Sequence, residues 1–254
     1  MYTLTLAQLY PAQMNIYGDR GNVIALRQRC GWRGITLQIL PIEVGQTVDW
    51  PTIDLAFFGG GQDSGQALIA NDFLQHQAEG LGRAVEDGMV LLAICGGYQL
   101  LGHYFLTHTG ERLPGIGLFD IHTVGGKERL IGNIMIETDL VAPDATPQAL
   151  ATPTRLVGFE NHSGRTFHGP RVESLGRVRV GYGDNGTDGV GGAIYRNSIG
   201  CYLHGALLPK NPQLADHLLR TALQRRYGKA ATLAPLDDTL ELVAQARMVE
   251  RLER

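Results

Sequence analysis

A cysteine separates an apolar run from two glycines in the stretch LLAICGGYQLLG, residues 91–102. The apolar run is typical of a buried strand, and a helical pattern follows the glycines. The small residues Ala93 and Gly97 leave room for the strained strand–turn–helix elbow that exposes a nucleophile. The amides and the positive dipole end of the helix favour a thiolate over a thiol. We predict that Cys95 is a nucleophile, the alternative being a buried structural cysteine.

A thiolate nucleophile needs a base and an oxyanion hole. The glycines of FFGGGQD, residues 57–63, follow an expected strand and can expose backbone N–H groups. We predict that the N–H of Gly60 or Gly61 acts with that of Gly96 as a two-donor oxyanion hole. The alternative is a plain glycine turn. The run matches neither the dinucleotide fingerprint nor a phosphate loop.

The predicted base is His204, which ends the strand-like run SIGCYLHG. Strand ends gather active-site residues, and an imidazole titrates in the physiological range. His162, in GFENHSGRT, is the strongest rival. The other histidines lie mostly on helical or polar loop stretches: His76, His103, His108, His122, His168 and His217.

The elements that must position these residues alternate between strand and helix in the first half of the chain. The expected strands are Leu4–Leu9, Ile35–Leu40, Leu55–Phe58 and Met89–Ile94, and the expected helices are Gly21–Cys30 and Phe73–Glu86. This alternation predicts an α/β fold of the flavodoxin type, with a mostly parallel central sheet flanked by helices. The glycine run and Cys95 then lie at the carboxyl edge of neighbouring strands.

The second half has short strand candidates separated by glycine-rich turns. These are Ile131–Glu137, Leu156–Phe159, Val178–Gly181, Ala193–Tyr195 and Ile199–Leu203. Two helices, 212–226 and 236–252, close the chain with apolar stripes that we expect to face the core. Val141–Thr154 is expected to be a surface loop. We predict a single domain over residues 1–254.

Composition narrows the function classes. A net charge of −3 gives no electrostatic argument for nucleic acid or an anionic membrane. No apolar run is long enough to span a bilayer, and we see no signal peptide. The sparse cysteines fit a reducing cytoplasm, and Cys30 and Cys201 are expected to be structural. Histidines and cysteines lack metal-ligand spacing, so we expect no metal site.

The chain resembles class I (triad) glutamine amidotransferases of the cobyric-acid-synthase-like branch, and within it the glutaminase subunits of lipid II isoglutaminyl synthases. The motifs that carry the resemblance are YPAQMNIYGDRGN (10–22), FFGGGQD (57–63), ICGGYQLLG (94–102), GFENHSGRT (158–166) and YLHGALLPKNP (202–212). They extend over nearly the whole chain, and MNIYGDRGN is the most specific pointer to those subunits.

The resemblance implies that L-glutamine is hydrolysed to glutamate and ammonia through a γ-glutamyl thioester. Cys95 would attack, and His204 would act as base and then as acid. Gln99, in the C-G-x-x-Q pattern, would contact the substrate. Arg129 matches a substrate-binding arginine of those subunits and can hold the α-carboxylate with a bidentate pair. The alternative for Arg129 is a solvated surface arginine.

The chain has no nucleotide-binding motif, although making an amide requires an activated carboxylate. The resemblance therefore implies no cofactor in this chain and a heterodimer with a MurT-like, Mur-ligase-family synthetase subunit that carries ATP and Mg²⁺. The pair would amidate D-glutamate of lipid II in peptidoglycan synthesis, in the cytoplasm at the inner membrane face. The alternatives are a free-standing γ-glutamyl cysteine hydrolase and a catalytically silent scaffold module.

The third member of the triad is not evident in the sequence. In the wider class a glutamate follows the catalytic histidine by two residues, but here that position is Ala206. Glu160 and Asp19 are the internal candidates. We favour an acid supplied by the synthetase subunit, which would leave the isolated chain weakly active.

Overall fold

The computed structural model describes residues 1–140 and 153–254. The predicted loop Val141–Thr154 therefore lies, apart from its last two residues, outside the described residues. In the described part of the chain, every helix is too short or too polar to cross a membrane.

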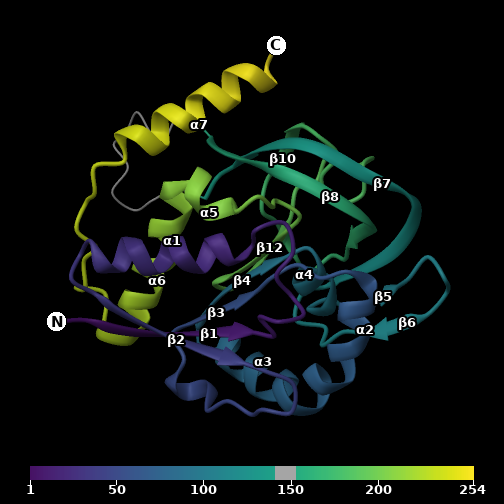
Figure 1. The fold of residues 1–254 in the computed structure, drawn as a ribbon, viewed down its shortest axis with the longest axis horizontal. Coiled ribbons are helices and arrows are strands. Elements are labelled where there is room, and N and C mark those ends of the chain that lie inside the picture. The colour runs from purple at the N-terminus through teal and green to yellow at the C-terminus, as the bar shows by residue number, and fades with distance from the viewer. Residues whose placement is uncertain (141–152) are drawn as a thin grey trace.

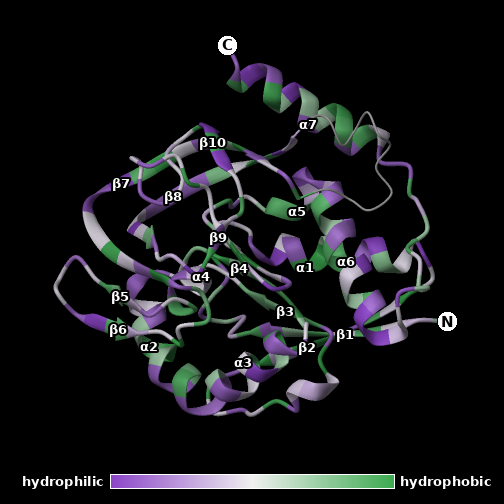
Figure 2. Cartoon of the chain, turned by 180° about the vertical axis from the view of Figure 1, so that it is seen from behind, coloured by the Kyte–Doolittle hydropathy of each residue, from purple (hydrophilic) through white to green (hydrophobic). Residues whose placement is uncertain are grey.

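A seven-stranded sheet forms the centre of the described fold, in the order β2-β1-β3-β4-β12-β11-β9. Its strands are β1 (Thr3–Leu9), β2 (Thr36–Ile42), β3 (Leu55–Phe58), β4 (Val90–Ile94), β9 (Glu173–Ser174), β11 (Ala193–Tyr195) and β12 (Ser198–Cys201). The pairs from β2 to β12 are parallel, and only β11 and β9 run antiparallel to their neighbours. Because β3 and β4 are buried along their whole length, they consist of apolar residues without alternation. The predicted parallel α/β sheet is confirmed (Figures 1 and 2).

Helices cover both faces of this sheet. The helices of the described chain are α1 (Arg20–Gly31), α2 (Asp63–Asp72), α3 (Ala78–Glu86), α4 (Gly96–Leu100), α5 (Leu207–Lys210), α6 (Pro212–Tyr227) and α7 (Thr239–Leu252), with short turns at Trp50–Thr52 and Phe73–Gln77. Figure 1 shows α1 and α6 on one side and α2 and α3 on the other. The predicted helix Phe73–Glu86 begins earlier, because Ile69, Ala70 and Phe73 continue the buried face of α3 into α2.

A second sheet lies beyond the carboxyl edge of the first. It contains β5 (Tyr104–Leu106), β6 (Arg112–Pro114), β7 (Ile121–Thr138), β8 (Thr154–His168) and β10 (Arg177–Val180). The predicted strands Ile131–Glu137 and Leu156–Phe159 are parts of the long β7–β8 pair. The pairing shifts register between Gly125 and Leu130, so residues 126–129 bulge out of the ladder.

The two C-terminal helices differ in burial. Leu214, Leu218, Leu219 and Leu223 of α6 are buried, as predicted. By contrast, α7 has no buried residue, and Leu240 remains 81% exposed. The prediction that both stripes face the core is therefore wrong for α7, which lies at the edge of the molecule in Figures 1 and 2. Periodicity indicates an apolar face but not what covers it.

Candidate active site

Cys95 lies at a sharp elbow between β4 and α4, as predicted. Its backbone has φ 50° and ψ −105°, which is a strained conformation for a residue with a side chain. A Cβ on Gly97 would come 2.5 Å from the carbonyl oxygen of Phe58, so only glycine fits there. The elbow holds the thiol at the carboxyl edge of the sheet, at the start of a helix.

His204 follows β12, the strand beside β4, and is fully buried. Backbone hydrogen bonds in both directions with Phe159 fix its position. Its Nδ1 lies 3.0 Å from Oδ1 of Asp19, which is also fully buried. Because a carboxylate can only accept, Nδ1 carries the proton and donates a hydrogen bond to Asp19. Nε2 has no hydrogen-bond partner among the described residues and remains available to a thiol.

The charges around His204 favour the imidazolium. Burial alone would lower the pKa of His204. Interaction with the sulfur of Cys95 and the hydrogen bond to Asp19 outweigh burial and raise this pKa from 6.5 to about 10.

Asp19, one of the two internal candidates for the third triad member, accepts from the imidazole within this chain. The acid from a partner subunit stays a prediction, because it concerns a second chain. Glu160 does not accept from the imidazole of His204. Its two carboxylate oxygens accept hydrogen bonds from the backbone N–H groups of Tyr182 (2.6 Å) and Gly183 (3.0 Å). Its role is to hold that loop against β8.

His162, the rival base, is buried in the wall of the same cavity as Cys95. Its ring stacks on Tyr202 at 3.7 Å between centroids, and its Nδ1 donates to the carbonyl of Gly164 (2.8 Å). His162 has no hydrogen bond to Asp19, the acid that accepts from His204.

Of the two glycines predicted to act with Gly96 in the oxyanion hole, the structure excludes Gly60. The N–H of Gly60 donates to Oδ2 of Asp19 (2.7 Å), so Gly60 is not available to an oxyanion and that assignment is wrong. The nitrogen of Gly61 lies 3.0 Å from the place where a Cβ of Gly96 would stand. Neither Gly61 nor Gly96 uses its N–H in a hydrogen bond to another described residue.

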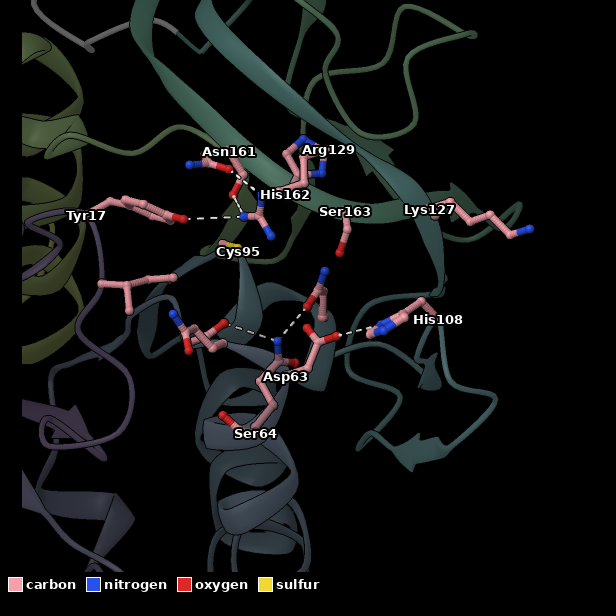
Figure 3. Close-up of a pocket in the computed structure, with 16 residues that line it drawn as sticks. Tyr17, Asp63, Ser64, Cys95, His108, Lys127, Arg129, Asn161, His162 and Ser163 are labelled. Carbon is pink, nitrogen blue, oxygen red and sulfur yellow. Dashed lines mark hydrogen bonds and ion pairs between the residues drawn. The ribbon is translucent and has the colours of Figure 1, made fainter.

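A cavity of about 400 Å³ opens in front of Cys95, between α2, the bulge of β7 and β8. Arg129 lies on its wall (Figure 3). The guanidinium donates to the side-chain oxygen of Asn161 (2.7 Å), to its carbonyl (2.9 Å) and to the hydroxyl of Tyr17 (3.3 Å). These bonds hold an exposed arginine in one orientation, whereas Lys127 points away from the cavity.

Gln99 also lines this cavity, but both ends of its amide have partners. Its Nε2 donates to the hydroxyl of Tyr202, and its Oε1 accepts from Nε2 of Gln66, each at 2.9 Å. The side-chain nitrogen of Gln66 therefore links Gln99 to the carbonyl of Gly61. Sequence reasoning did not assign roles to Gln66, Tyr17 or Asn161, although Tyr17 and Asn161 fall within the motifs quoted above. In the described residues, no set of three or more His, Cys, Asp or Glu side chains is placed to hold a metal ion.

Comparisons with known proteins agree with this geometry. A model of the CobB/CobQ-like glutamine amidotransferase domain matches residues 5–212. The GatD subunit of lipid II isoglutaminyl synthase (glutamine-hydrolyzing) from Staphylococcus aureus is 38% identical over all of this chain and 98% of that protein. The GatD subunit from Streptococcus pneumoniae is 37% identical over 94% of this chain and 88% of that protein.

More distant similarities agree on the fold. Cobyric acid synthase from Limosilactobacillus reuteri is 32% identical over 74% of this chain and 34% of that longer protein. The solved structure of PurLQS from Thermotoga maritima superposes with a TM-score of 0.60 at 16% identity, over 88% of this chain and 99% of that one. A glutamine amidotransferase from the same organism gives 0.52 at 14% identity, over 99% and 94%. This chain belongs to the CobB/CobQ-like glutamine amidotransferase family, among relatives that include GatD subunits matched over nearly their full length.

Proposed function

We propose that this chain is the glutaminase subunit of a lipid II isoglutaminyl synthase. It hydrolyses L-glutamine and supplies the ammonia with which a partner subunit amidates D-glutamate of lipid II. The observation that carries the chemistry is that Cys95, His204 and Asp19 lie together at one edge of the central sheet, beside a cavity. The identity of 37–38% to GatD subunits, over nearly their full length, supports the proposed substrate and pathway.

The first half of the reaction makes a thioester. Sγ of Cys95 attacks the γ-carbonyl carbon of glutamine, and Nε2 of His204 takes the thiol proton. The carbonyl oxygen becomes an oxyanion that accepts hydrogen bonds from the N–H groups of Gly61 and Gly96. When this intermediate collapses, the C–N bond breaks and His204 gives the proton to the leaving nitrogen, which departs as ammonia. Asp19 stabilises the imidazolium between these two transfers.

The second half restores the enzyme. A water molecule gives a proton to His204 and attacks the thioester carbon. The carbon–sulfur bond then breaks, glutamate leaves, and the sulfur regains the proton. Arg129 binds the α-carboxylate of glutamine, since its guanidinium is held at the cavity wall by Asn161 and Tyr17.

The partner in this proposal is a MurT-like, Mur-ligase-family synthetase that carries ATP and Mg²⁺, and the heterodimer works in the cytoplasm at the inner face of the membrane. The subunit names of the full-length relatives support the existence of a partner. Asp19 bonds His204 within this chain, whereas an acid supplied by the partner predicts a weakly active isolated chain that gains activity in the complex. The alternative, a free-standing γ-glutamyl cysteine hydrolase, would be fully active without a partner.

The test is co-expression with the Mur-ligase-like protein, followed by amidation assays with glutamine or with ammonium as nitrogen donor. In the complex, Cys95→Ser should abolish glutamine-dependent amidation of lipid II and leave ammonium-dependent amidation intact, because Cys95 acts only in ammonia release. Trapping of a glutamine-analogue adduct on Cys95 separates an enzyme from a silent scaffold. Wild-type glutamine hydrolysis by the Ser variant would contradict the proposal.

A further inference from the structure

One buried polar atom in the cavity wall has no use in the chemistry described so far. Gln66, on the first turns of α2, is 1% exposed and lines the cavity with Cys95. Its Nε2 donates to Oε1 of Gln99 (2.9 Å) and to the carbonyl of Gly61 (3.3 Å). Its Oε1 has no partner among the described residues. A buried acceptor without a donor costs free energy, so a ligand that brings a donor gains from meeting it.

The orientation of this amide is fixed by its neighbours. The carbonyl of Gly61 can only accept, so the nitrogen of Gln66 must face it and the oxygen must face the other way. Gln99 is held in turn by Tyr202, whose hydroxyl also bonds Thr166 at 2.7 Å. The result is a rigid acceptor, which is what recognition of a small ligand requires.

The position of Gln66 relative to the reacting groups limits which donor it can meet. A Cβ on Gly96 would come 3.0 Å from Cδ of Gln66 and 3.0 Å from the nitrogen of Gly61, so the amide adjoins the predicted oxyanion hole. His204 lies against a different glycine, because a Cβ on Gly60 would come 2.8 Å from its ring.

Glutamine has two groups of N–H donors, its γ-amide and its α-ammonium. The γ-amide must turn its oxygen to Gly61 and Gly96 and its nitrogen to His204, which protonates it. The α-ammonium is then the donor that remains for Gln66. We propose that Oε1 of Gln66 accepts a hydrogen bond from the α-ammonium of the substrate and thereby selects α-amino acids. This inference rests on the proposed glutaminase function.

The test compares L-glutamine with glutaramate, which is glutamine without its α-amino group, by ammonia release from the wild-type protein with its co-purified partner. Wild type should prefer L-glutamine. Gln66→Met should lower kcat/KM for L-glutamine on the order of ten- to a hundredfold, the usual effect of losing a hydrogen bond to a charged group. It should leave kcat/KM for glutaramate nearly unchanged. A merely structural role would lower both values together, which would overturn the inference while glutamine hydrolysis by wild type stands.

Two further variants keep the test decisive. Gln66→Asn retains an amide but shortens its reach by one methylene, and it should also lose the preference; a folded Asn variant with undiminished preference overturns the inference. Gln77→Met is the matched control, since Gln77 is equally buried with an unpartnered Oε1 but lies outside the cavity. Its substrate ratio should equal that of wild type. Absence of glutamine hydrolysis in wild type would overturn the proposed function and this inference together.

Discussion

At the scale of single residues, Asp19 does two things with one carboxylate. Oδ1 accepts from Nδ1 of His204, and Oδ2 accepts from the N–H of Gly60. In Asp19→Asn, the side-chain oxygen is drawn to the N–H of Gly60, because that donor needs an acceptor. The amide nitrogen then faces Nδ1 and forces the proton onto Nε2, where it blocks proton transfer from Cys95. We expect glutaminase kcat to fall by about 10²–10⁴, the upper value being the loss for the equivalent change in a serine protease.

The same variant should change the pH profile. Asp19 helps to raise the pKa of His204 to about 10, so its loss lowers that pKa. The imidazolium that protonates the leaving amide nitrogen is then lost at lower pH, and the alkaline limb of the activity profile moves in that direction. Asp72→Asn, which changes a carboxylate bonded to the hydroxyl of Tyr10, is the control and should retain activity. Unaltered kcat in Asp19→Asn would mean that another group orients His204.

At the scale of elements, the elbow between β4 and α4 depends on glycine. In Gly97→Ala the new Cβ would meet the backbone oxygen of Phe58 at 2.5 Å, and a backbone atom cannot rotate away. Helix α4 must then shift from β3, which we expect to cost about 1–3 kcal/mol of unfolding free energy. The displacement of Cys95 should reduce kcat by on the order of 10². Urea unfolding and ammonia release measure the two effects.

Gly82→Ala provides the matched control for this change. Gly82 lies inside α3, and a Cβ there meets nothing within 4 Å. Alanine should therefore stabilise the protein by roughly 0.5–1 kcal/mol through helix propensity, with activity unchanged. If both alanine variants behave alike, the close contact of Gly97 with Phe58 does not limit the elbow.

Features set by residues close together in the chain could be predicted from the sequence, whereas features set by residues far apart could not. The elbow was predictable because Ala93, Cys95 and Gly97 are neighbours and their sizes determine the turn. Asp19 could be named only as one candidate, because it lies 185 residues from His204 and meets it through the packing of the loop before α1. The length of β7 and β8 was missed because the bulge at residues 126–129 interrupts the apolar alternation.

At the scale of the whole molecule, the site needs the two sheets to be held in a fixed relative position. The central sheet supplies Cys95 and His204, whereas Arg129 and Asn161 come from the second sheet. Asn211, fully buried between α5 and α6, joins strand β8 of the second sheet to helix α5. Its Oδ1 accepts from the N–H of Val157 in β8, and its Nδ2 donates to the carbonyls of Val157 (2.9 Å) and Leu207 (2.7 Å).

Asn211→Ala should therefore loosen β8 from helices α5 and α6. The change leaves the buried N–H and C=O of Val157 without these partners, and we expect a loss on the order of 3 kcal/mol in the free energy of unfolding. Because β8 also holds His204 through Phe159 and Arg129 through Asn161, KM for glutamine should rise together with the loss of stability. Asn197→Ala is the control, since the side chain of Asn197 bonds the carbonyl of Gly88 and, among the described residues, makes no hydrogen bond to β8. Urea unfolding and steady-state ammonia release would separate the two variants, and equal losses in both would show that Asn211 does not hold β8 against α5 and α6.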